Sequence, residues 1–226
     1  MLRFLLAGLH VVEGFSPRSG IKRGLKPSTT RAIAMSAVIA TMQFATNKEP
    51  VPFFIEDGTG VPGYRQSDND LARLALAAWT RESGGKLKFV ETKSKNDALL
   101  RVRWISSYEG LFGETQRTSV NGKIGAVVNV MPEVSQLGEP LSTRAVSDNL
   151  LRETIVYLTC VHELGHAVGL NHTRNFEDIM YSFAYGGDFV EYFMRYRNLL
   201  QTRADIAKYS GLSARDIDIL RNLYKD

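Results

Sequence analysis

The chain has 226 residues, of which 44% are hydrophobic and 10% aromatic, enough for one well-buried globular domain or two small ones. Its formal net charge of +4 comes from the N-terminus, because residues 1–50 carry seven basic and two acidic side chains, whereas residues 51–226 carry 21 basic and 22 acidic ones. Residues 51–226 are thus nearly neutral, which argues against nucleic acid as a partner, because binding its phosphates needs Lys and Arg clustered on one face. The single cysteine, Cys160, excludes an internal disulfide framework and a thiolate-rich metal site.

Residues 1–49 are predicted to form an N-terminal leader that contributes nothing to the core. Two short apolar runs, residues 4–12 and 32–40, flank a stretch rich in Gly, Pro, Ser and basic residues. Neither run reaches the roughly 18 to 20 residues needed to span a bilayer. The second run ends with Val38 and Ala40, spaced like the small residues before a signal-peptidase cut. We therefore expect a secreted or periplasmic protein without stable membrane insertion; a disordered leader or an over-extended start is the alternative.

Residues 50–226 are expected to form one folded domain, and its first part alternates between strands and a helix. Apolar residues at helical spacing predict a helix that begins at Ser67 or Asp68, either of which can cap it, and ends near Ser83. Two later strands are joined through Asn121 and Gly122, a strong hairpin signal, and should pair antiparallel. The predicted strands lie at residues 51–55, 87–91, 98–105, 111–118 and 124–130.

Two helices are predicted in the second part of the domain. Ser147 or Asp148 should cap a long helix that continues to about Val168 and ends at Gly169. The last helix begins near Ser213, with an acidic residue in the capping-box position three residues later. The intervening loop before the long helix is rich in Pro, Ser and Gly and is expected to lack regular structure.

Three of the four histidines lie within eleven residues, in the order His-Glu-Leu-Gly-His-Ala-Val-Gly-Leu-Asn-His. His162 and His166, four residues apart, project from one face of the long helix, so both imidazoles can reach one ion. Gly169 can leave helical geometry without a side-chain clash, which lets the chain turn and bring His172 to the same ion. Three ligands leave the fourth tetrahedral position open for water, the arrangement of a catalytic Zn²⁺ site.

Glu163 directly follows the first of these histidines, so its carboxylate should lie beside the metal without being a ligand. It is predicted to be the general base that takes the proton of a zinc-bound water and passes it to the departing amine. A lone HExxH pattern can also be two unrelated histidines on a helix, but the added Gly169 and His172 make a chance match rare.

At these residues the chain resembles the metzincin zinc metallopeptidases, in particular their matrixin-like branch. Their HExxHxxGxxH motif is followed by a turn with a methionine beneath the metal, and Met180 fits that turn, eight residues after His172. The resemblance covers about residues 51–226 and implies an α+β fold: a twisted mixed sheet with an antiparallel edge strand, an active-site helix, the methionine turn and a C-terminal helix. It further implies a zinc-dependent endopeptidase that acts on proteins or peptides. We expect a monomer; a zinc-stabilised binding module without turnover is the alternative function.

The resemblance also implies where substrate would bind. In this fold an edge strand borders the cleft, here residues 111–118, and an extended peptide can add to such an edge. The residues expected to contact substrate are Phe112, Gly113, Glu114 and Tyr181.

The sequence departs from the family in several places. The body has no further histidine, so one catalytic zinc is predicted without a second, histidine-bound structural zinc. Calcium stays undecided, since Asp68 and Asp70 fit the start of a helix. Cys160 is predicted to be a buried core residue and not a regulatory thiol. Matrixins usually carry paired acidic residues at the start of the last helix, where this chain has Arg215 and Asp216.

A further departure is the long segment of residues 183–210 between the methionine turn and the last helix. Four aromatic residues fall on one helical stripe within it: Phe189, Tyr192, Phe193 and Tyr196. Two interpretations stay open. The segment is either an added core helix, or a helix that shapes the pocket for the side chain following the scissile bond.

Overall fold

The computed structural model describes residue 44 and residues 49–106 and 112–225. The predicted leader, residues 1–49, therefore lies outside the described residues except for Phe44 and Glu49, as does Leu111 at the start of the predicted edge strand. Phe44 is 2% exposed and belongs to the hydrophobic core, so the prediction that the leader contributes nothing to the core was wrong at this residue. Among the helices that the model describes, none combines the length and apolarity needed to cross a membrane.

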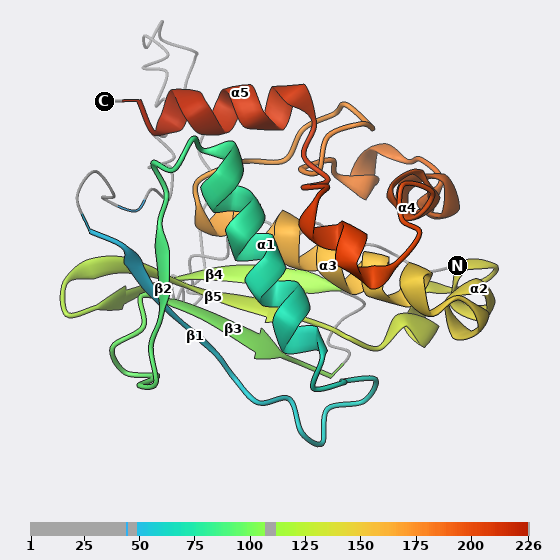
Figure 1. The fold of residues 1–226 in the computed structure, drawn as a ribbon, viewed down its shortest axis with the longest axis horizontal. Coiled ribbons are helices and arrows are strands. Elements are labelled where there is room, and N and C mark those ends of the chain that lie inside the picture. The colour runs from blue at the N-terminus through green and yellow to red at the C-terminus, as the bar shows by residue number, and fades with distance from the viewer. Residues whose placement is uncertain (1–43, 45–48, 107–111, 226) are drawn as a thin grey trace, which may run out of the picture. The chain divides into compact units, whose positions relative to one another are not determined.

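A mixed sheet forms one layer of the fold, with strand order β2-β1-β3-β5-β4 (Figure 1). The strands are β1 (Val51–Ile55), β2 (Phe89–Glu91), β3 (Leu100–Trp104), β4 (Gly113–Val120) and β5 (Lys123–Val130). Four of them pair in parallel, and β4 pairs antiparallel with β5 at one edge. The predicted mixed sheet with an antiparallel edge strand, and with it the α+β class, is confirmed.

The β4–β5 hairpin turns at Asn121 and Gly122, whose φ angles of 52° and 74° are both positive. These are the angles that a two-residue type I′ turn requires, and Asn and Gly tolerate them best. The resulting register pairs Val120 with Lys123 at the turn and Gly113 with Val130 at the far end. The predicted hairpin is confirmed, and its register brings the first residues of β4 to the long helix that carries the histidine motif.

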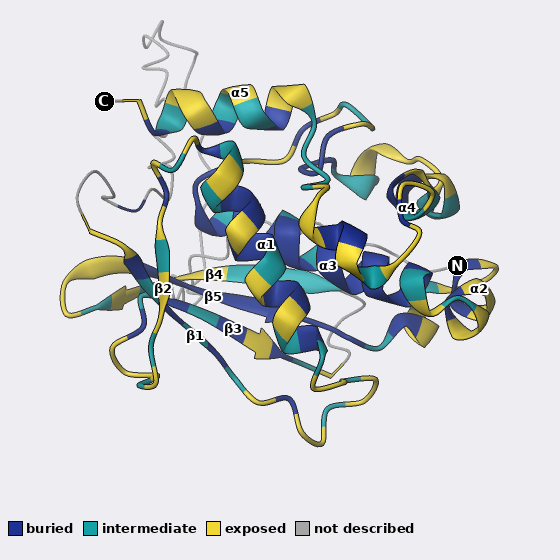
Figure 2. Cartoon of the chain, viewed as in Figure 1, coloured by how far each residue is buried: buried dark blue, intermediate teal, exposed yellow. Residues whose placement is uncertain are grey.

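The described residues contain five α-helices, which complete the α+β fold (Figure 1). They are α1 (Asp68–Glu82), α2 (Leu141–Ser147), α3 (Asn149–Ala167), α4 (Phe189–Arg197) and α5 (Ala214–Leu223). Helices α1 and α3 pack on each other, and α3 also contacts β4 and β5. Buried positions dominate α3, whereas α1 and α5 expose one side (Figure 2). Helix α2 lies where the sequence predicted an irregular loop.

Helix α3 lies at the centre of the core, and most of its residues are buried. Trp79 of α1 is fully buried beside it, and its indole N–H donates to Val161 O at 3.1 Å. Cys160, also in α3, is fully buried, which confirms its prediction as a core residue. Burial raises the pKa of its thiol, so the thiol stays protonated and unreactive.

The helix caps agree with prediction at α3 and α5 but not at α1. Asp148 accepts a hydrogen bond from Leu151 N at 3.1 Å, and Ser213 forms the predicted capping box at α5. At α1, Ser67 makes no side-chain cap and its backbone is already helical. Asp68 is fully buried and paired with Arg152 of α3. The predicted side-chain cap was wrong because this long-range ion pair uses the carboxylate instead.

Candidate active site

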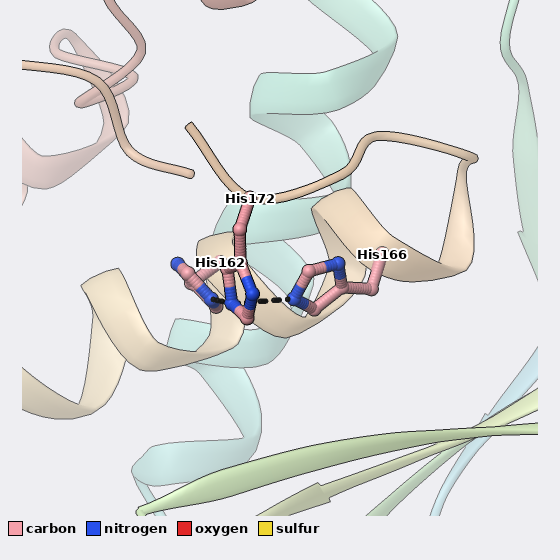
Figure 3. A group of neighbouring side chains, drawn as sticks. All are labelled: His162, His166 and His172. Carbon is pink, nitrogen blue, oxygen red and sulfur yellow. Dashed lines mark hydrogen bonds between the residues drawn. The ribbon is translucent and has the colours of Figure 1, made fainter. Parts of the chain in front are cut away.

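Three imidazoles meet at the C-terminal end of α3 (Figure 3). His162 and His166 project from adjacent turns of α3, and His172 returns from the loop that follows Gly169, whose φ of 105° ends the helix. The Nε2 atoms of His162 and His166 each lie 3.2 Å from Nε2 of His172. The structure therefore brings together all three predicted ligands, with one ligand atom from each within 4.8 Å of the others.

Backbone carbonyls set the direction of two of these rings. His162 Nδ1 lies 2.6 Å from Ile179 O, and His166 Nδ1 lies 2.9 Å from Leu170 O. Because a carbonyl oxygen only accepts hydrogen bonds, each Nδ1 carries the proton and each Nε2 presents its lone pair. Burial lowers the pKa of both imidazoles, which favours the neutral form that can bind a metal.

This arrangement of nitrogen atoms fits a zinc ion. A proton on Nε2 of His172 would satisfy one of the two facing lone pairs, whereas a cation among the three nitrogens would satisfy all of them. Three neutral imidazoles without a thiolate are a ligand set of catalytic Zn²⁺ sites, and hydrogen bonds from Nδ1 to carbonyls are usual for such ligands. Within residues 44, 49–106 and 112–225, no second group of three His, Cys, Asp or Glu side chains has comparable geometry.

Glu163 lies between α3 and the edge strand β4. Its side chain is outside the group of ligand atoms and is 6% exposed. Thr115 of β4 donates to it from Oγ1, which lies 2.9 Å from Glu163 Oε2. Burial raises the pKa of Glu163, the Thr115 hydrogen bond lowers it and the nearby charge of Glu114 raises it, and together they bring it to about 8. A cation among the histidines would also lower this pKa, because it favours the charged carboxylate.

The predicted methionine turn packs directly beneath this end of α3. Met180 is fully buried, and Gly165 of α3 makes room for it, since a Cβ at Gly165 would lie 2.3 Å from Met180 Sδ. Thr173 N donates to Met180 O at 2.8 Å. The segment that carries His172 is therefore hydrogen-bonded to the methionine turn. Sequence reasoning missed the role of Gly165, although a glycine inside a helix is itself a signal of close packing.

Helix α5 holds the same turn from the other side. Asp216 accepts a hydrogen bond from Ile179 N at 2.7 Å, and the carbonyl of that residue faces His162. Arg215 Nε lies 3.7 Å from Asp178 Oδ2, so the basic residue that departs from the family's acidic pair has an acidic partner in the turn. Residue Ile179 thus links α5 to a predicted metal ligand.

The aromatic stripe after the turn forms helix α4. Tyr192 and Phe193 are 4% and 6% exposed and belong to the hydrophobic core. The Tyr192 hydroxyl donates to Ile179 O at 3.1 Å, the carbonyl that also faces His162. The interpretation of this segment as an added core helix predicts that both side chains are buried, as they are. A role of α4 in a substrate pocket stays a prediction.

The four residues predicted to contact substrate lie in two places. Phe112, Gly113 and Glu114 are partly buried at the start of β4, whose outer edge carries no further strand of the described sheet. Tyr181 is 5% exposed, and its hydroxyl donates to Gly186 O at 3.1 Å. Among the described residues β4 is therefore the edge strand of the sheet beside the site, Tyr181 is buried, and contact of these residues with substrate stays a prediction.

Asp68 and Asp70, which the sequence assigned to the start of a helix while it left calcium undecided, each pair with an arginine. Asp68 is paired with Arg152, and Asp70 forms an ion pair with Arg73. Both residues lie in the first turn of α1, as the sequence indicated.

The family model described as Matrixin matches residues 47–190 of the chain. The matched range includes the three clustered histidines, Glu163 and Met180, and it ends inside α4. No curated protein matches the chain.

Proposed function

Because the chain belongs to the matrixin family, whose members are zinc metallopeptidases, we propose that it is a zinc-dependent endopeptidase with Glu163 as its general base. One observation carries the proposal: the Nε2 atoms of three histidines converge, and the glutamate that follows the first of them in α3 is buried and is not among the ligand atoms. A catalytic zinc site needs both features, ligands that leave a position open and a base that stays free.

The chemistry divides between the metal and the protein. His162, His166 and His172 would hold the zinc through Nε2. When bound, zinc lowers the pKa of water and polarises the scissile carbonyl. Glu163 accepts the proton of the attacking water at its carboxylate and delivers it to the departing amine. Its buried position between α3 and β4 keeps the carboxylate out of bulk water and raises its pKa, and a bound zinc would lower that pKa toward the ionised form that accepts a proton.

The position of β4 as the edge strand of the described sheet supports an extended peptide as the substrate. An added strand would form backbone hydrogen bonds along residues 113–115, and pockets for alternate side chains would provide selectivity. Phe112, Gly113, Glu114 and Tyr181 remain the proposed substrate-contacting residues. We propose that unfolded or flexible proteins are the substrates and that the enzyme works as a monomer.

Metal removal tests this function. The purified full-length chain should cleave unfolded casein, lose that activity when a chelator removes the zinc, and regain it when Zn²⁺ is added back. Activity is measured as the release of fluorescence from labelled casein, and zinc content by atomic absorption. Stoichiometric zinc without any turnover would instead identify a zinc-stabilised binding module.

A separate proposal concerns the leader. We propose that the leader, residues 1–49, directs export and that residues 50–226 form the peptidase domain, because a basic stretch precedes the apolar run of residues 32–40. Expression in a bacterium with a periplasm should give an exported product whose mass corresponds to cleavage shortly after Ala40. A product that keeps Met1 and stays in the cytoplasm would refute the export signal. Replacing Ala40 with a bulky residue such as Phe should block processing, and the same change at Ala45 serves as the control.

A further inference from the structure

The edge strand and the active-site helix meet at Glu163. Thr115 Oγ1 lies 2.9 Å from Glu163 Oε2 and 2.7 Å from Glu163 O, both within hydrogen-bonding distance. The hydroxyl therefore contacts the carboxylate and the backbone of the same residue. This double contact restricts both the rotamer of Glu163 and the distance between β4 and α3.

Gly113, two residues earlier, provides the space that the carboxylate occupies. A Cβ at this position would lie 2.5 Å from Glu163 Cγ and from Glu163 Oε1. Gly113 is not among the glycines with positive φ, so its backbone conformation does not require glycine. The close approach to Glu163 is the physical reason for glycine here.

The two positions belong to one face of the strand. Residues i and i+2 of a strand point to the same side, so Gly113 and Thr115 both face α3. The intervening Glu114 pairs across the sheet with Asn129 of β5. β4 therefore offers its outer edge to a peptide and one of its faces to the proposed catalytic base.

We propose that Thr115 is a positioning residue for Glu163, with Gly113 as the residue that makes room for its carboxylate. The inference rests on the proposed function and goes beyond it, because it links peptide addition at the edge of β4 to the placement of the base. A bound peptide that pairs with β4 would restrict the movement of the strand and of the Thr115 hydroxyl. That hydroxyl in turn keeps the Glu163 carboxylate in the orientation that accepts a proton.

The Thr115→Val substitution tests the role of the hydroxyl. Valine has the shape of threonine and suits a strand, so the fold should be kept while the hydrogen bond is lost. We expect kcat for a labelled peptide to fall about 10-fold or more, as for other groups that orient an active-site residue, with KM and zinc affinity nearly unchanged. Thr115→Ser should recover most of the activity. Gly113→Ala, which crowds the carboxylate and keeps Thr115, should also lower kcat.

Thr118→Val is the matched control, because the Thr118 hydroxyl belongs to the same strand and has no hydrogen-bond partner among the described residues. It should leave kcat unchanged. Zinc affinity by chelator competition and the midpoint of thermal unfolding are measured for each variant, so that loss of the metal or of the fold is distinguished from misplacement of the base. If the wild type cleaves peptide and Thr115→Val matches Thr118→Val in kcat, the inference is overturned and the proposed function stands. If the wild type is zinc-loaded but inactive, both are overturned.

Discussion

Replacing Glu163 with glutamine should lower kcat for casein by about 10²–10⁴-fold, the contribution typical of a general base, while zinc stays bound. Glutamine has nearly the same shape as glutamate, and its amide oxygen can still accept the hydrogen bond from Thr115. It cannot accept the proton that peptide hydrolysis releases from water. Turnover of labelled casein and zinc affinity by chelator competition measure the two properties separately.

Glu177→Gln is the matched control for this substitution. Glu177 is an exposed glutamate in the segment between His172 and the methionine turn, so its loss of charge should leave turnover unchanged. Cleavage that survives Glu163→Gln at the wild-type rate would contradict the assignment of the base. Loss of zinc together with activity would assign the residue to the integrity of the metal site instead.

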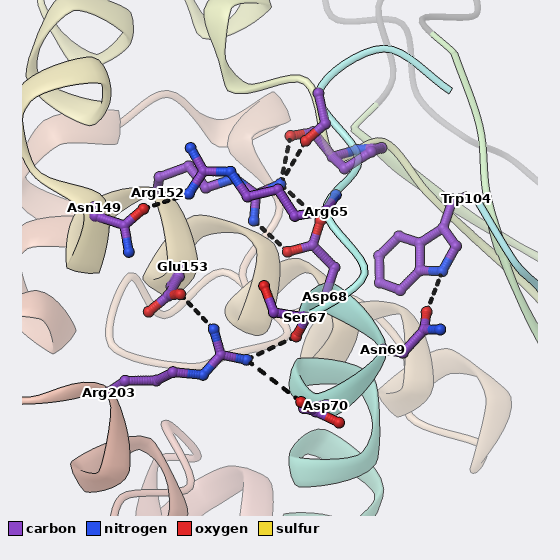
Figure 4. A network of polar contacts seen from close by, with 12 residues as sticks. Arg65, Ser67, Asp68, Asn69, Asp70, Trp104, Asn149, Arg152, Glu153 and Arg203 are labelled. Atoms are coloured by element: carbon purple, nitrogen blue, oxygen red, sulfur yellow. Dashed lines mark hydrogen bonds and ion pairs between the residues drawn. The ribbon is translucent and has the colours of Figure 1, made fainter. Parts of the chain in front are cut away.

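Replacing Arg152 with leucine should destabilise the fold by about 3–5 kcal/mol, because it leaves a buried carboxylate without its partner. Arg152 is 2% exposed and Asp68 is fully buried, and their side chains lie at the centre of the polar network in Figure 4. Arg152 Nη2 lies 2.7 Å from Asp68 Oδ2 and also 2.7 Å from Gly63 O. The substitution thus breaks contacts that join α1, α3 and the loop before α1. Urea unfolding of the zinc-loaded chain measures the decrease in the free energy of unfolding.

Two controls separate burial from charge in this prediction. Arg73→Leu breaks ion pairs with Asp70 and Glu91 at the exposed side of α1, and exposed pairs usually contribute no more than about 1 kcal/mol. The double substitution Asp68→Leu with Arg152→Leu should recover part of the stability, since no unpaired charge then stays buried. If Arg152→Leu and Arg73→Leu lowered the free energy of unfolding equally, burial of the Arg152–Asp68 pair would not matter for stability.

Much of the site could be predicted because the information is local. His162 and His166 share a face of one helix through their spacing alone, and Gly169 permits the turn toward His172 because it has no Cβ. Asn121 and Gly122 likewise specify the hairpin through their tolerance of positive φ. These features depend on residues within a few positions of one another.

The roles that the sequence did not reveal depend on distant partners. Thr115 and Glu163 are 48 residues apart, and a threonine in a strand has no feature that identifies such a contact. Asp216 was predicted as a helix cap, but its hydrogen bond to Ile179, 37 residues away, also ties α5 to the methionine turn. Helix α2 was missed because its N-cap, Pro140, makes no side-chain hydrogen bond.

Asp68 shows most directly how tertiary structure decides among local options. The sequence allowed it to cap α1, but it pairs instead with Arg152, 84 residues further along the chain. A buried guanidinium requires a negative partner, and that requirement outweighs a cap contribution of about 1 kcal/mol. By itself, the sequence determined the histidine pattern, the position of the predicted base and the order of most of the elements, because spacing and backbone preference act locally. Only the tertiary structure decided which side chains hold those groups in place, because that depends on which distant surfaces the fold buries against each other.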